Sequence, residues 1–254
     1  MKEKIFSKTF CLSPGESNGQ QEMPLSLLAG RIIEVATLHA ESWDVGYTEL
    51  IKNHLAWVLS RLTIEVTRFP AINENYTLLT WIESYNKHFS ARNFELIDGE
   101  GRTFGFARTI WVVLDLSTRR SSDMSRLENL GTLVLDRPCP IEPFSHIKVD
   151  TEQKLLSYPV RYSDIAPTRH VNSMRYIEHI LDLYPFSWYD RYRVSRFEIA
   201  FAHEARPGID IDVYARQTTA TDHCVELRHE ESCLCKSRLC FELRAEPVSL
   251  PFMG

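Results

Sequence analysis

SRLTIEVTRFPAINENYTLLTW, residues 60–81, returns in pattern as SRFEIAFAHEARPGIDIDVYAR, residues 195–216. When the two stretches are aligned without gaps, Arg61 meets Arg196, and both stretches alternate apolar with polar residues. A proline then interrupts each alternation, which resumes after it. The pattern predicts two β-strands joined by a turn, and the chain contains it twice.

The segments that precede the two stretches also match. Residues 27–41 and 173–184 carry apolar residues at helical spacing, and we expect a helix in each. A shorter helical stretch is expected after each helix, at 48–58 and at 185–191. The helices therefore come in the same order in both copies.

The outermost segments complete two similar units. Residues 93–116 and 224–245 each indicate a hairpin with a polar turn, and opening strands are expected at 4–12 and 155–162. Each unit then reads as one strand, one helix and several antiparallel strands, which predicts an α+β fold. Two such units side by side can bury their helices and merge their sheets, which removes an open edge from each.

Between the units lies a segment rich in proline. Residues 117–150 are polar at first and then contain Pro138, Pro140 and Pro143, which favour an extended path. We interpret this segment as a linker. The predicted organisation is an N-terminal unit at 1–116, the linker at 117–150 and a C-terminal unit at 151–254.

Composition excludes several classes of protein. The 254 residues are 44% hydrophobic and 25% charged, which is ordinary for a globular protein, and the formal net charge of −5 argues against nucleic-acid binding. No stretch approaches the roughly 18 apolar residues of a membrane span. The N-terminus lacks a signal-peptide run, so we expect a cytoplasmic protein. The six cysteines form no zinc-like pairs, and we expect no metal site and no cofactor.

One histidine stands at a position suited to chemistry. A strand is expected to end near Ser163, and His170 comes just before the helix that begins near Asn172 or Ser173. Free N–H groups at a helix start can hold a developing oxyanion, and a histidine near neutral pKa suits general base catalysis. From these residues alone, His170 is either a catalytic group or an ordinary polar loop residue.

The same segment carries a resemblance to a known family. The run YSDIAPTRHVNSMRYIEHILDLYP resembles the signature of the acyl-acyl carrier protein thioesterases of plants and bacteria. The matching residues are Ser163, Asp164, His170, Val171, Asn172, Tyr176, Ile177 and Pro185. Residues 54–70 resemble the family's tryptophan-containing helix and the strand after it, and 108–120 resemble its T-R-R stretch. The similarity covers roughly residues 5–245.

The resemblance implies a fold and an activity. The fold is a tandem hotdog, in which a long helix is wrapped by a curved antiparallel sheet, twice. The activity is hydrolysis of acyl thioesters on acyl carrier protein, which releases free fatty acid in fatty acid biosynthesis. The implied partner is an acylated acyl carrier protein.

The family's catalytic residues are only partly present. Its histidine falls on His170 and its glutamate on Glu204, whereas its aspartate and asparagine fall on Ala166 and Thr168. Ala166 can neither orient an imidazole nor accept a proton, while Thr168 can still form one hydrogen bond. The position of a cysteine in plant members is Ala205. We therefore expect an activity that is retained, weakened or redirected.

Two further residues complete the predicted site. Asp164 points the same way as residue 166 if the chain is extended, and it is a conjectural substitute for the missing aspartate. Backbone N–H groups near Val171 and Asn172 are expected to hold the oxyanion. The first unit has Ser26 and Phe69 where the second has His170 and Glu204, so only the second is expected to be catalytic.

The first unit is expected to bind the acyl chain. In the family its helix lines the acyl pocket, which implies Leu28, Ile32, Val35 and Trp57 here. The same four residues also fit an ordinary core that faces the sheet.

Two alternative functions and the partners remain open at this stage. An acyl-CoA thioesterase of the hotdog class would use the same residues, and a non-catalytic acyl-chain binder would explain Ala166 and Thr168. Basic landing sites for an acidic carrier protein are either Arg119 and Arg120 or Arg191, Arg193 and Arg196, unless these arginines are scattered on the surface. The sequence leaves open whether a second copy pairs to form a homodimer, and which chain length is preferred.

Overall fold

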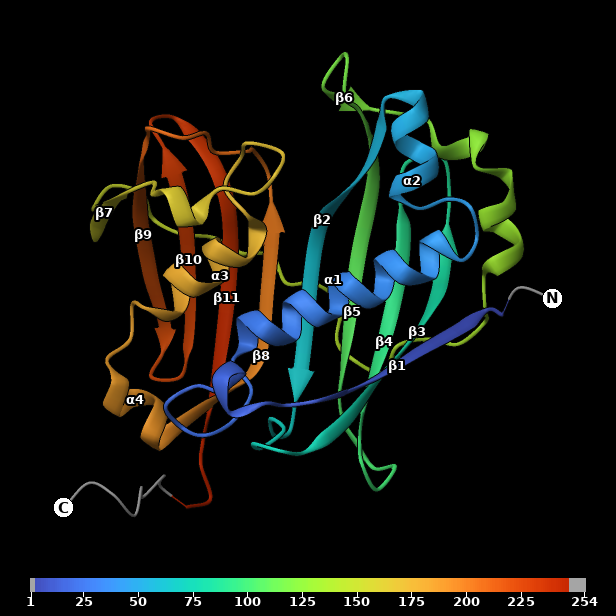
Figure 1. Ribbon diagram of the computed structural model, residues 1–254. Helices are drawn as coiled ribbons and strands as arrows, with labels where there is room; N and C mark the ends of the chain where they lie inside the picture. The colour runs from blue at the N-terminus through green and yellow to red at the C-terminus, as the bar shows by residue number, and fades with distance from the viewer. Residues whose placement is uncertain (1–2, 247–254) are drawn as a thin grey trace.

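Two units with the same order of elements follow each other along the chain (Figure 1). The structure is a computed structural model that describes residues 3–246, apart from the side chains of residues 126, 128 and 129. The first unit contains β1 (Ile5–Cys11), α1 (Leu25–Glu41), α2 (Tyr47–Leu50), β2 (Leu55–Val66), β3 (Asn75–Tyr85), β4 (Ser90–Asp98) and β5 (Thr103–Asp115). The second contains β7 (Leu156–Pro159), α3 (Ser173–Leu181), α4 (Phe186–Arg191), β8 (Tyr192–Phe201), β9 (Asp210–Thr219), β10 (Asp222–His229) and β11 (Ser232–Leu243).

The strands of both units form one continuous sheet. Within the described residues its order is β1-β3-β4-β5-β2-β8-β11-β10-β9-β7, and the short β6 (Arg120–Ser121) pairs with β5. From the centre outward, the strands of the first unit follow the order β2, β5, β4, β3, β1. Their equivalents in the second unit follow the same order, β8, β11, β10, β9, β7. The units therefore merge through β2 and β8, and the tandem hotdog fold expected from the sequence is confirmed.

The register at the centre shows how closely the two units are related. Strands β2 and β8 are antiparallel, and Thr63 pairs with Glu198. On either side of that pair, the partners are Arg61 with Ala200 and Glu65 with Arg196. The gapless sequence alignment makes Thr63 equivalent to Glu198, so a pseudo-twofold axis passes through this pair.

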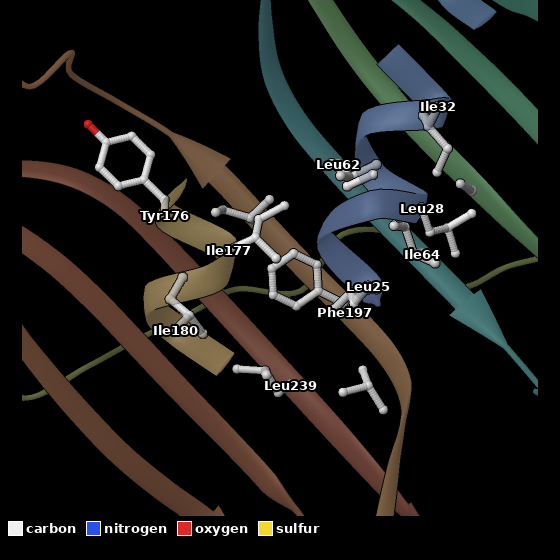
Figure 2. Close-up of a cluster of buried hydrophobic side chains, with 14 of the residues drawn as sticks. Leu25, Leu28, Ile32, Leu62, Ile64, Tyr176, Ile177, Ile180, Phe197 and Leu239 are labelled. Carbon is white, nitrogen blue, oxygen red and sulfur yellow. The ribbon is translucent and has the colours of Figure 1, made fainter. Parts of the chain in front are cut away.

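The core lies between the helices and one face of the sheet. In Figure 1, α1 crosses the strands of the first unit and α3 crosses those of the second. Figure 2 shows Leu28 and Ile32 of α1 near Leu62, and Ile177 of α3 near Phe197. Their spacing of three or four residues places one face of each helix on the sheet. Fully burying one such side chain contributes roughly 1.5–3 kcal/mol.

The linker packs against the sheet instead of crossing open solvent. The Trp81 indole donates a hydrogen bond to the Arg137 carbonyl at 2.6 Å, and the guanidinium of Arg137 lies 4.2 Å from the centre of that ring. Cys139 is buried and donates to the carbonyl of Ala107. Parts of the linker form short 3-10 helices, Met124–Arg126 and Glu128–Leu133. The domain boundaries at 116 and 150 stay predictions.

One predicted element is wrong, and others are shorter than expected. The helix expected at 48–58 is limited to α2 and the 3-10 turn Ile51–Asn53, because His54 adopts a left-handed φ of 56° and Leu55 starts β2. Trp57 therefore lies on a strand. The strand expected at 155–162 covers only β7, and the helix at 173–184 ends at Leu181. No helix in the described part of the chain is long and apolar enough to cross a membrane.

Candidate active site

Two loops of the second unit bring His170 and Glu204 together. The distance from His170 Nε2 to Glu204 Oε2 is 3.4 Å. The Val171 N–H donates to the carbonyl of Ala205 at 2.9 Å, and the Ala205 N–H donates to the Tyr176 hydroxyl at 3.2 Å. Because Ala205 is almost completely buried, these bonds fix the loop that carries Glu204 beside the loop that carries His170.

The loop before α3 has a defined shape. The Ala166 N–H donates to the His170 carbonyl at 2.8 Å, and the Arg169 N–H donates back to the Ala166 carbonyl at 2.9 Å. Arg169 has a left-handed φ of 63°, which lets the chain reverse just before the histidine. Asn172 then caps α3 by accepting a hydrogen bond from the Met174 N–H at 3.0 Å. Hydrogen bonds thus fix the main chain on both sides of His170.

A third residue reaches this pair from the start of the linker. Arg119 stands in the turn between β5 and β6 with a left-handed φ of 58°, and its guanidinium forms an ion pair with Oε2 of Glu204. The same carboxylate oxygen faces His170. Glu204 is therefore held between a permanent cation and a titratable imidazole. The sequence had suggested Arg119 only as a landing site for a carrier protein.

The surroundings of His170 favour its neutral form. Burial lowers its pKa most, and the nearby charges of Arg119 and Arg206 lower it further, while the main chain of Thr168 acts in the opposite direction. Nδ1 of His170 is buried and has no hydrogen-bond partner of ordinary geometry among the described residues. Ala166, where the resembling family has an aspartate, offers no side-chain acceptor. A neutral imidazole is the form that can accept a proton.

Asp164 is occupied elsewhere. It is buried, its Oδ2 accepts a hydrogen bond from the Arg161 N–H at 2.7 Å, and its Oδ1 lies 3.5 Å from His179 Nε2. These contacts stabilise the turn before the loop that carries His170. The conjecture that Asp164 replaces the missing aspartate beside His170 gains no support from its contacts.

The predicted oxyanion donors are also occupied. The Val171 N–H donates to Ala205 and the Asn172 N–H donates to the Asp164 carbonyl at 2.8 Å. The expectation that these two groups hold the oxyanion is wrong, because each already has an acceptor. The Asn172 side chain is used as a helix cap.

A cavity of about 360 Å³ opens beside the histidine loop. It lies between α1 and the strands of the first unit, and Thr168, two residues before His170, forms part of its wall. The other lining residues are Ile33, Ala36, Thr37, Ala40, Val45, Gly46, Tyr47, Ala56, Trp57, Ile82, Ser90, Arg92, Trp111 and Leu130. A mostly apolar cavity of the first unit thus reaches the loop that carries His170, although His170 and Glu204 are not among its lining residues.

The cavity uses a different face of α1 from the one expected. Leu28, Ile32 and Val35 are fully buried in the core and are not among the lining residues, whereas Trp57 does line the cavity. The lining residues of α1 include Ala36 and Ala40, one turn apart. Small residues at helical spacing leave room beside a helix, so these two alanines are the sequence signal that indicates the cavity.

A second cavity, of about 370 Å³, lies near the N-terminal end of α1 and the C-terminal end of α3. Its lining includes Phe69, which the sequence alignment makes equivalent to Glu204. An aromatic ring cannot hold or move a proton as a carboxylate does. The expectation that the first unit lacks a catalytic pair is consistent with this cavity.

The arginines expected to receive a carrier protein are mostly paired. Arg196 binds Glu65 and Glu198, and Arg193 binds Glu242 at 3.0 Å. Two other arginines, Arg169 and Arg206, are exposed next to the site residues. Among the described residues, no group of three or more His, Cys, Asp or Glu side chains is placed to hold a metal ion.

Comparison with known proteins gives matches along most of the chain. A family model described as the acyl-ACP thioesterase N-terminal domain matches residues 3–127, and one described as the acyl-ACP thioesterase C-terminal domain matches residues 147–240. A curated relative, oleoyl-acyl carrier protein thioesterase 1, chloroplastic, from Arabidopsis thaliana, is 26% identical over 85% of this chain. The chain spans 64% of that relative's length.

Solved structures show the same architecture. The crystal structure of an acyl-ACP thioesterase from Bacteroides thetaiotaomicron superposes with a TM-score of 0.87 at 34% identity, covering 94% of this chain and 98% of that one. The 12:0-ACP thioesterase from Umbellularia californica superposes with a TM-score of 0.85 at 18% identity, covering 96% of this chain and 99% of that one. The second likeness concerns the fold alone.

Proposed function

The chain belongs to the acyl-ACP thioesterase family, and from this membership we propose that it hydrolyses the thioester of a fatty acyl chain on acyl carrier protein. One observation carries the proposal. His170 Nε2 and Glu204 Oε2 lie 3.4 Å apart, and Thr168 of the same loop lines a cavity suited to an acyl chain. The products are a free fatty acid and the carrier protein thiol.

The geometry supports a general-base mechanism. With the imidazole proton on Nδ1, Nε2 accepts a proton from a water whose oxygen attacks the thioester carbonyl carbon. The carbonyl π electrons move onto oxygen, and they return as the carbon–sulfur bond breaks. The thiolate leaves and takes up the proton from the imidazolium. A thiol has a reference pKa of about 8.5, so this leaving group needs little acid assistance.

Glu204 and Arg119 support this step without taking the proton in the proposed scheme. The carboxylate stabilises the imidazolium that forms, because an opposite charge within about 4–6 Å favours the charged form. Arg119 fixes that carboxylate and keeps the pKa of the resting imidazole low. Arg119 and Glu204 together therefore favour a neutral imidazole before the reaction and a charged imidazolium during it.

The proposed partner is an acylated acyl carrier protein. Acyl carrier protein is acidic, and the exposed Arg169 and Arg206 flank the site. We also propose, from the sequence, that the protein acts in fatty acid biosynthesis, forms a homodimer and is located in the cytoplasm.

The test compares one acyl chain on three carriers: acyl carrier protein, coenzyme A and N-acetylcysteamine. We expect the highest kcat/KM with the carrier protein. Arg169→Asn, which tolerates the left-handed φ, should lower kcat/KM only for the carrier protein. Equal values for coenzyme A and carrier protein, both unchanged in Arg169→Asn, would identify an acyl-CoA thioesterase instead.

A second candidate function rests on a specific observation. The buried Nδ1 of His170 has no partner of ordinary geometry in the part of the chain that the structure describes, and residue 166 is an alanine. Both features fit a protein that binds acyl chains without hydrolysing them. In that case none of the three thioesters would be hydrolysed, yet the free fatty acid would still bind in calorimetry. Exchange of Ala166 and Thr168 for Asp and Asn would then create a rate where there was none.

A further inference from the structure

A buried arginine stands in the wall of the acyl cavity. Arg92 of β4 lines the cavity and is only 6% exposed. Its Nη1 donates to Nδ1 of His39 at 2.7 Å and to Oγ1 of Thr80 at 3.3 Å. An acyl chain alone has no use for a guanidinium, since a charge beside hydrocarbon is costly.

Among the described side chains, no acid neutralises this charge. Among the residues that the structure describes, no carboxylate forms an ion pair with Arg92, and Nε and Nη2 make no hydrogen bond. Burial lowers the pKa of Arg92 to about 10, so the guanidinium is still cationic at neutral pH. Burial and the charge of Arg92 lower the pKa of His39 to about 4, so this partner is a neutral acceptor. A guanidinium has five N–H donors, and within the described residues only those of Nη1 are used.

Arg92 is placed to meet the part of a bound acyl chain that is distant from the thioester. Thr168 approaches the cavity from the second unit, which joins the first through β2. Strand β4 is separated from β2 by β5, and two strand spacings amount to about 10 Å. Ser90, also on β4, lines the cavity next to Arg92 and adds a hydroxyl to that wall. An acyl group whose thioester lies at His170 therefore reaches β4 with its distal carbons.

We propose that this cavity selects acyl chains that carry an oxygen acceptor on their distal part, and that Arg92, assisted by Ser90, binds that oxygen. The acceptor is a hydroxyl, an oxo group or a carboxylate. This inference rests on the proposed thioesterase function, because the thioester at His170 sets which end of the chain meets β4. Arg92 is then a specificity residue with no part in the hydrolytic step.

The test uses acyl thioesters of N-acetylcysteamine in a series of chain lengths, each with a methyl, an ω-hydroxyl or an ω-carboxyl end. We expect kcat/KM of the wild type to favour an oxygenated end by about tenfold or more at the best length, as for a buried hydrogen bond to a charge. Arg92→Met, of similar length but apolar, should remove or reverse the preference. Arg92→Lys should keep part of it for the carboxylate, and Ser90→Ala should weaken it.

Two further measurements separate the possible failures. Calorimetric binding of dodecanoic and 12-hydroxydodecanoic acid to wild type and Arg92→Met tests selection without catalysis, and thermal melting checks that the variants fold. A wild type that prefers the methyl end at every length overturns the inference, whatever Arg92→Met does. Hydrolysis of none of the thioesters, with Arg92-dependent binding of the hydroxy acid, overturns the thioesterase function alone.

Discussion

At the scale of single residues, the unusual feature is the environment of His170, the proposed base. Its Nδ1 is buried and has no hydrogen-bond partner of ordinary geometry among the described residues, and residue 166 of the same loop is an alanine. An unpaired buried donor costs about 1–3 kcal/mol. The proposed site therefore keeps an imidazole and its carboxylate neighbour, Glu204, but residue 166 offers no side-chain acceptor that would select the tautomer.

Ala166→Asp should supply that group. A carboxylate beside Nδ1 fixes the proton there and stabilises the imidazolium, so we expect kcat to rise, by about tenfold for one charged hydrogen bond. It should also raise the pKa of His170, which burial and two arginines now lower. Because the base must be neutral, the rising limb of the kcat/KM profile should move to higher pH. An unchanged profile would show that residue 166 does not face the imidazole.

The sequence predicts this site in part. His170 and Glu204 are found because they keep the positions of a known motif. The sequence does not predict Arg119 as their partner, because Arg119 lies far from both residues along the chain. Only folding brings its turn next to Glu204. The sequence also does not predict that Arg92 lines the cavity. In the alternating pattern of β4 it occupies an ordinary polar position, and only the structure shows that it is buried.

At the scale of elements, the turn between β5 and β6 connects the two units at the site. Arg119 reaches from this turn, at the start of the linker, to Glu204 in the loop after β8. The strands β5 and β8 that lead into the turn and the loop are predicted correctly, because their apolar residues alternate. Of the helix predicted at 48–58, the part up to Asn53 is helical and the part from Leu55 is strand. Short apolar runs fit both periods, and the left-handed His54 marks the change.

Arg119→Gln should loosen Glu204 and remove a positive charge near His170. We expect kcat to fall about tenfold or more, since a charge-assisted hydrogen bond of about 1.5–3 kcal/mol is lost. The pKa of His170 should rise, which moves the limb of the pH profile upward. Arg120→Gln, one residue along the same turn, is the matched control and should change neither. If kcat falls but the limb of the pH profile does not move, Arg119 has a structural role only.

At the scale of the whole molecule, a charged network holds the units and the linker together near the pseudo-twofold axis. Glu198 is completely buried and accepts hydrogen bonds from the N–H of Ser145 at 2.6 Å, from its hydroxyl at 2.7 Å and from Nε of Arg196 at 2.6 Å. Arg196 also binds Glu65 of the first unit. The linker is therefore part of the folded structure, which its prolines alone do not indicate.

Glu198→Ala should destabilise the protein by about 3 kcal/mol, because removing one member of a buried ionic network leaves the others unpaired. The measurement is the free energy of unfolding in urea. Glu242→Ala removes a half-exposed partner of Arg193 on the same sheet and should cost at most about 1 kcal/mol. Equal losses in the two variants would contradict a central role for the network.

The most direct measurement compares the rate of hydrolysis of an acyl-acyl carrier protein by wild type and by His170→Ala. We expect a loss of roughly 10²–10⁴-fold in kcat, the usual contribution of one general base. His229→Ala, on a histidine whose ring bonds to the Asp210 carbonyl, should retain the wild-type rate. Equal rates for wild type and His170→Ala would show that the imidazole beside Glu204 is not the base.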